Sequence, residues 1–78
     1  MKIIIRNLSR STTESEIKDL FTKFGVVESC DLVMDKQTGG SKGFGFVEMP
    51  NAKHARYAIK NLNDKTIASS RIRVKEAS

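Results

Sequence analysis

Two phenylalanines, Phe44 and Phe46, stand one residue apart in the segment K-G-F-G-F-V-E-M at residues 42–49. Successive side chains of a β-strand point to opposite faces of the sheet, so both rings belong to one face. Val47 and Met49 occupy the alternate positions and suit a buried core, which leaves the two phenylalanines on the open face. An exposed aromatic ring stacks on an unpaired nucleic acid base, and each stack contributes roughly 1–3 kcal/mol. The spacing therefore predicts a stacking surface for bases.

Basic side chains are expected to surround these rings. The strand predicted at residues 71–75 reads R-I-R-V-K, so its cations point outward when its isoleucine and valine point inward. The same alternation applies to K-I-I-I-R at residues 2–6, and only Asp31 and Glu48 bring negative charge to the face. The predicted binding residues are Lys2, Ile4, Arg6, Lys42, Phe44, Phe46, Arg71, Arg73 and Lys75, with Lys36 on a loop nearby.

Such a face fits a single nucleic acid strand. Cations bind phosphates, and aromatic rings stack only on bases that are not paired. We therefore expect single-stranded RNA or single-stranded DNA as the partner, and no duplex. Catalysis by a general acid and base needs titratable groups that converge in a pocket, whereas Asp31 and Glu48 are expected on an open sheet among cations. An enzyme with a small-molecule substrate is not expected.

Two helices must support the sheet. The first is expected to begin after Thr13, which can cap it, with Glu16 completing a capping box, and to end at a left-handed cap on Gly25. Its apolar face consists of Ile17, Leu20, Phe21 and Phe24. The second is expected to begin after Asn51. Its apolar stripe consists of Ala55, Ala58, Ile59 and Leu62.

The order of elements predicts the fold. Strands are expected at residues 2–8, 26–34, 43–49 and 71–75, with a hairpin loop at 35–42 and a loop at 63–70. Cys30, Leu32 and Met34 are expected to share one face of the second strand. The order β-α-β-β-α-β predicts an α+β, ferredoxin-like fold: a four-stranded antiparallel sheet with both helices on one face and the first and third strands in the middle.

Composition limits the class of protein. A chain of 78 residues has room for one domain, residues 1–78, and its net charge of +5 indicates a polyanionic partner. One cysteine and one histidine exclude an internal disulfide and a four-ligand zinc site, and no cofactor is expected. Apolar runs such as Ile3–Ile5 are far shorter than the roughly 20 residues of a membrane span. No secretory signal is apparent. Because the single cysteine cannot form an internal disulfide, we expect a reducing compartment, the cytoplasm or the nucleus. Nothing in the sequence suggests an obligate dimer, so a monomer is expected.

Two motifs resemble those of the RNA recognition motif family. The segment K-G-F-G-F-V-E-M at 42–49 is similar to its octamer motif, and I-I-I-R-N-L at 3–8 is similar to its hexamer motif. The intervening segments T-E-S-E-I-K-D-L-F-T-K-F-G and D-K-Q-T-G-G-S-K-G-F are also similar, so the resemblance covers about residues 2–77. The compact format is similar to that of stand-alone bacterial members.

This resemblance assigns roles by position. It implies that Phe46 stacks on one base, that Phe44 lies against the sugars between two nucleotides, and that Lys42 neutralises a phosphate. Ile4 stands where the family usually has a second stacking ring, so one stacking surface is missing and affinity should fall. Other departures are Met49 in place of an inward aromatic residue, and Asp64 and Ser69 where the family often has glycine.

An isoleucine at position 4 also suits a dry protein contact, so a second class of function stays open. In that alternative the chain is a protein-interaction module that uses the same sheet face or the second helix. The residues that distinguish RNA from single-stranded DNA are not identifiable in the sequence.

Overall fold

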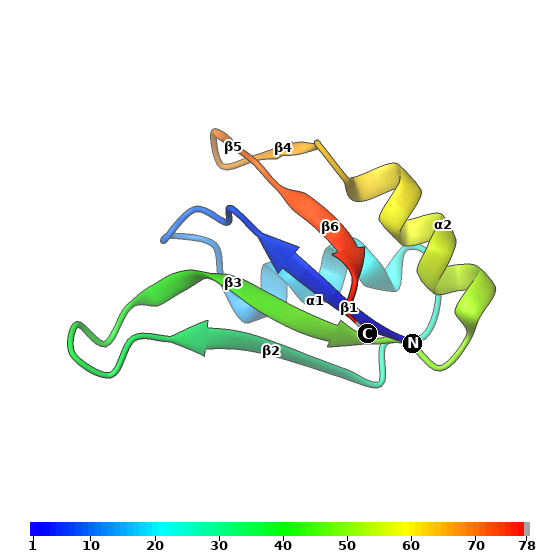
Figure 1. Cartoon of the computed structure of the whole chain (residues 1–78), viewed down its shortest axis with the longest axis horizontal. Helices are drawn as coiled ribbons and strands as arrows, with labels where there is room; N and C mark the ends of the chain where they lie inside the picture. Colours follow the sequence, from blue (N-terminus) through cyan, green and yellow to red (C-terminus); the bar gives the residue numbers. More distant parts are fainter. Residues whose placement is uncertain (78) are drawn as a thin grey trace.

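The computed structural model describes residues 1–77, which form a four-stranded antiparallel sheet and two helices (Figure 1). The elements in chain order are β1 (Lys2–Arg6), α1 (Glu14–Thr22), β2 (Ser29–Met34), β3 (Ser41–Glu48), α2 (Ala52–Leu62), β4 (Thr66–Ile67), β5 (Ser70–Arg71) and β6 (Arg73–Glu76). The strand order is β2-β3-β1-β6, with β1 and β3 in the middle. The predicted ferredoxin-like α+β fold is confirmed.

The core lies between one face of the sheet and the helices, and α1 passes behind the sheet in Figure 1. Ile3 of β1 pairs with Val47 of β3, and both side chains are fully buried. The other buried apolar residues are Ile5, Leu8, Ile17, Phe21, Met49, Ala55, Ala58, Leu62, Ile72 and Val74. Because alternate residues of each strand enter this core, the residues between them form a second face that no helix covers.

Both helices begin where the sequence predicts. The Thr13 hydroxyl accepts a hydrogen bond from the Glu16 N–H at 3.2 Å, and the Thr13 N–H donates to Glu16 Oε1 at 3.1 Å, which completes the capping box. The side chain of Asn51 accepts hydrogen bonds from the N–H groups of Lys53 and His54 at 2.9 and 3.1 Å. Across residues 1–77, neither helix has the length and apolar character of a membrane span.

The role predicted for Gly25 is wrong. The last residue of α1 is Thr22, and Lys23 caps it in a right-handed conformation with a φ of −63°. Gly25 has a φ of 158°, which is not the left-handed helical conformation. The side chain of His54 on α2 lies where a Cβ at position 25 would stand. The glycine therefore permits the close approach of α2.

The second strand differs from the prediction at both ends. β2 begins at Ser29 and not at residue 26. Its register with β3 shifts between Leu32 and Met34, which breaks the expected alternation. Cys30 and Leu32, before the shift, pack against the core as expected, whereas Met34, after it, is 50% exposed.

The segment 63–70, predicted to be a loop, contains most of a small two-stranded ribbon. β4 and β5 pair antiparallel, with Thr66 opposite Arg71. The last strand of the main sheet starts only at Arg73. The sequence predicted that Arg71 shares a strand with Arg73 and Lys75. This prediction is wrong, because Arg71 lies in the ribbon.

Candidate nucleic-acid interface

The rings of Phe44 and Phe46 lie on the uncovered face of the sheet, as predicted. Their centroids are 6.2 Å apart and their planes meet at 86°, the edge-to-face arrangement that aromatic pairs favour. Both side chains are half-buried, and Ile4 of β1 pairs directly with Phe46. We call these three side chains, Ile4, Phe44 and Phe46, the ring surface.

Gly45, between the two rings, allows β2 to approach β3 closely. A Cβ at this position would lie 2.6 Å from the carbonyl oxygen of Asp31 and 3.3 Å from the Cα of Leu32. Both are backbone atoms of β2, so a side chain at position 45 would push the strands apart. The glycine therefore preserves the β2–β3 pairing that fixes the direction of the rings.

Charge differs between the two sides of Phe46. On the β2 side its pairing partner is the exposed Asp31. On the β1 side its partner is Ile4, which in turn pairs with Lys75 of β6. Lys2 of β1 places its Nζ 4.8 Å from the centroid of the Phe46 ring. A phosphate backbone is therefore attracted toward β1 and β6 and repelled from β2.

Two arginines face each other at the β1–β6 edge of the ring surface. Arg6 and Arg73 are paired across the strands, and like charges directly opposite destabilise a sheet. Arg73 Nε lies 3.5 Å from Asp64 Oδ1, but both side chains are half exposed, so this ion pair is weak. Together with Ile4, Lys75 and the carboxylate-bearing Glu76, the arginines line an open hollow in which cations outnumber the one acidic side chain. An anion bound in this hollow would relieve the repulsion between them.

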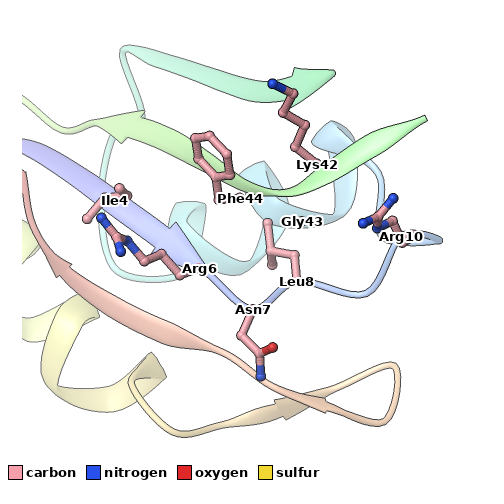
Figure 2. A pocket seen from close by; sticks show the side chains of 8 residues that line it. All are labelled: Ile4, Arg6, Asn7, Leu8, Arg10, Lys42, Gly43 and Phe44. Atoms are coloured by element: carbon pink, nitrogen blue, oxygen red, sulfur yellow. The ribbon is translucent and has the colours of Figure 1, made fainter. Parts of the chain in front are cut away.

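A second hollow, of about 490 Å³, lies beside Phe44, between β3 and the loop that follows β1 (Figure 2). Its floor includes Gly43, which has a φ of 84° and whose missing Cβ would stand 3.2 Å from the Leu8 carbonyl oxygen. The Leu8 N–H donates a hydrogen bond to the Gly43 carbonyl at 2.8 Å, which ties the loop after β1 to β3. The cations that line this hollow are Arg6, Arg10 and Lys42.

Comparison with known protein families identifies the family to which this chain belongs. A family model described as the RNA recognition motif matches residues 3–73. The chain belongs to the RNA recognition motif family. The resemblance inferred from the hexamer and octamer motifs is thereby confirmed, and the family is one of non-catalytic RNA-binding domains.

Individual relatives agree with this assignment. The chain is 46% identical over 59 residues to UBP1-associated proteins 1B of Arabidopsis thaliana, in an alignment that covers 76% of this chain and 15% of the relative. Its sequence is 39% identical to that of RNA Binding Protein PG1, whose crystal structure superposes with a TM-score of 0.95. The alignment covers 99% of this chain and 93% of the PG1 chain. Its sequence is 31% identical to that of the protein in an SXL-lethal protein/RNA complex, with a TM-score of 0.93. The alignment covers 99% of this chain and 46% of that protein chain.

Most of the predicted residues of this RNA recognition motif lie together. Of those named from the sequence, Arg71 lies outside the four-stranded sheet, in the β4–β5 ribbon, and Lys36 lies in the loop between β2 and β3. The Arg71 carbonyl accepts a hydrogen bond from Asn7 Nδ2 at 2.7 Å, which joins the end of β1 to the ribbon. Asn7 has a φ of 60°, so the chain turns directly after β1. The part that each of these side chains plays in binding stays a prediction.

Sequence reasoning missed Arg10 of this RNA recognition motif. The run S-R-S-T-T at residues 9–13 predicts a polar loop, and the one signal in this loop is a cation shortly after the hexamer motif. The structure brings Arg10 to the same hollow as Lys42 and Phe44. Because Arg10 and Lys42 are far apart in the sequence, their proximity in the fold could not be predicted from it.

The only cysteine of the chain, Cys30, is a poor nucleophile at neutral pH. Burial, followed by the negative charges of Glu14 and Asp31, raises the pKa of the Cys30 thiol to about 11. Because the thiolate is the reactive form, this raised pKa lowers the reactivity of Cys30. Within the part of the chain that the structure describes, no three His, Cys, Asp or Glu side chains are grouped to hold a metal ion.

Proposed function

We propose that this domain binds single-stranded RNA across the ring surface, as a monomer and without catalysis. The observation that carries the proposal is the outward placement of Phe44 and Phe46 on a sheet face that no helix covers. Bases of a single strand stack on such rings. The similar SXL-lethal protein/RNA complex supports RNA as the ligand.

Each residue of the ring surface has a different role in this proposal. Phe46 stacks on one base, and Phe44, which meets Phe46 edge to face, lies against the sugars between two nucleotides. Ile4 gives the neighbouring base an apolar contact without a stack. The affinity is therefore lower than that of a domain with an aromatic ring at position 4.

Phosphate contacts come from the cations around the ring surface. Lys42 at the start of β3 and Arg6, Arg73 and Lys75 at the β1–β6 edge supply about four contacts, and the log–log salt slope of a single strand is then near −3. Arg71 extends this basic edge from the ribbon. Sequence preference is modest, because stacking discriminates little between bases.

A titration tests the proposal. A fluorescently labelled RNA of mixed sequence is titrated with the wild type and with Phe46→Ala, and binding is followed by anisotropy over a series of salt concentrations. Tyr57→Ala is the matched control, because Tyr57 is 60% exposed and lies on α2, on the helical side of the sheet. We expect Phe46→Ala to weaken binding and Tyr57→Ala to leave it unchanged.

Two results would contradict the proposal. Binding that Phe46→Ala retains would show that RNA does not use the ring surface. RNA binding that changes little with salt would show that the cations around the ring surface do not contact phosphates. A DNA of the same sequence, titrated in parallel, distinguishes RNA from single-stranded DNA, and light scattering checks that the protein is a monomer.

A further inference from the structure

We infer that Arg10 joins Lys42 in binding the RNA backbone and contacts the phosphate of a nucleotide beyond those on the ring surface, so that the RNA chain leaves the sheet over the loop after β1. The inference rests on the proposed function, because it extends the path of the same strand. It adds a phosphodiester subsite that lies partly on a loop and not on the sheet.

The first argument is the position of the two cations. Arg10 and Lys42 line the hollow of Figure 2 together with Phe44, and in that view Gly43 lies between Phe44 and Arg10. A Cβ at Gly43 would stand 3.2 Å from the Leu8 carbonyl oxygen, so the glycine allows the loop after β1 to lie against β3. A strand whose sugars lie against Phe44 can therefore continue along this loop toward Arg10.

The second argument is that the loop holds Arg10 in a defined place. The Thr12 N–H donates a hydrogen bond to the Ser9 carbonyl at 3.0 Å, which closes a turn around Arg10. The hydroxyls of Ser9 and Ser11 are 2.8 Å apart, and the Ser11 N–H donates to Ser9 Oγ at 3.3 Å. Because the Leu8 N–H also anchors the loop to β3, little backbone entropy is lost when Arg10 binds an anion.

The third argument is that no carboxylate competes for these cations. Among residues 1–77, neither Arg10 nor Lys42 has an ion pair within 4.0 Å. The acidic residues of the nearby helix start are engaged elsewhere: Glu16 caps α1, and Glu14 accepts a hydrogen bond from the Leu32 N–H at 3.1 Å. A free guanidinium binds a phosphate with two parallel hydrogen bonds, so the hollow is suited to a phosphodiester.

Two charge-neutralising variants and two lengths of RNA test the inference. Arg10→Gln is compared with Arg56→Gln, which removes the same charge from the exposed face of α2. Each is titrated with a mixed-sequence hexanucleotide and a mixed-sequence dinucleotide. We expect Arg10→Gln to weaken hexanucleotide binding about ten-fold, as loss of a charge-assisted hydrogen bond does, and to reduce the salt slope by about 0.7. Dinucleotide binding should match that of Arg56→Gln.

The outcomes separate this inference from the proposed function. Equal affinities of Arg10→Gln and Arg56→Gln for the hexanucleotide would overturn the inference, provided that Phe46→Ala still weakens binding. An equal loss on both RNA lengths would also overturn it, because Arg10 would then act on the ring surface itself. If Phe46→Ala leaves hexanucleotide binding intact, the proposed function fails first. Thermal unfolding of both arginine variants checks that the fold is retained.

Discussion

The ammonium group of Lys2 lies 4.8 Å from the centroid of the Phe46 ring. Lys2 pairs with Glu48 across β1 and β3, so its side chain reaches along the sheet to the neighbouring ring. A base that stacks on this face of Phe46 has to displace the ammonium group. An exposed cation–π contact contributes about 0.5–1 kcal/mol, less than the roughly 1–3 kcal/mol of a base stack. We therefore expect a stacked base to displace Lys2 from Phe46 and the freed ammonium group to bind a phosphate.

Replacement of Lys2 by methionine tests this exchange. Lys2→Met keeps the length of the side chain but removes the charge, so RNA binding should weaken at low salt, where the phosphate contact is strong. At high salt the contact is screened and the difference should disappear. The log–log salt slope measured by anisotropy should become less steep by about 0.7.

Lys60→Met on α2 is the matched control and should keep the wild-type slope. If Lys2→Met and the wild type give parallel lines, Lys2 makes no phosphate contact in the complex.

A ring at position 4 should strengthen RNA binding. Ile4 is half-buried and lies directly opposite Phe46, where a second ring would extend the stacking surface. Ile4→Tyr is expected to lower the free energy of RNA binding by on the order of 1 kcal/mol. Isothermal titration calorimetry with one RNA measures the difference, and Ile4→Val serves as an aliphatic control. Unchanged or weaker binding by a folded Ile4→Tyr variant would place Ile4 off the path of the RNA.

The sequence was sufficient to predict the faces of the central strands. A period of two placed Phe44 and Phe46 outward because Val47 and Met49 had to enter the core, and the structure confirms this arrangement. Local rules also located the capping box of Thr13, because all of its partners lie within one turn.

Features that depend on contacts between distant segments could not be predicted. The register shift that exposes Met34 arises from the pairing of β2 with β3, and nothing in the sequence around Leu32 marks it. Arg10 reaches the hollow only because the Leu8 N–H binds the Gly43 carbonyl. The turn of the ribbon carries Ala68 in place of the glycine or asparagine that would have indicated a hairpin.

Cys30 should make the stability of the fold sensitive to alkaline pH. The pKa of its thiol is raised from 9.0 to about 11, first by burial and then by the charges of Glu14 and Asp31. As pH rises through 9, the unfolded chain loses this proton while the folded chain keeps it, so the contribution to stability falls. It is fully present below pH 9 and is lost by about pH 11.

Urea unfolding of the wild type and of Cys30→Ala over this range measures the effect. The difference between their free energies of unfolding should shrink as pH rises. In the folded wild type, reaction with iodoacetamide should also be slower than in the unfolded chain. A constant difference, or equal reaction rates, would contradict the raised pKa.

The turn between β4 and β5 offers a way to stabilise the domain. Ala68 and Ser69 have φ values of 50° and 67°, and both lie in the left-handed region that costs an L-residue roughly 1 kcal/mol. Two-residue hairpin turns with positive φ at both positions favour Asn-Gly. Ala68→Asn combined with Ser69→Gly should therefore raise the free energy of unfolding by on the order of 1 kcal/mol.

A matched comparison isolates the backbone effect. Ser69→Gly alone should stabilise the fold, whereas Ser70→Gly, one residue later in β5, should destabilise it, because glycine weakens a strand. Thermal unfolding should show Tm changes of opposite sign, by several degrees, since about 1 kcal/mol corresponds to roughly 4–8 °C in a domain of this size. Equal changes in the two variants would mean that Ser69 is not left-handed in solution. The family's preference for glycine at this position would then need a cause other than backbone conformation.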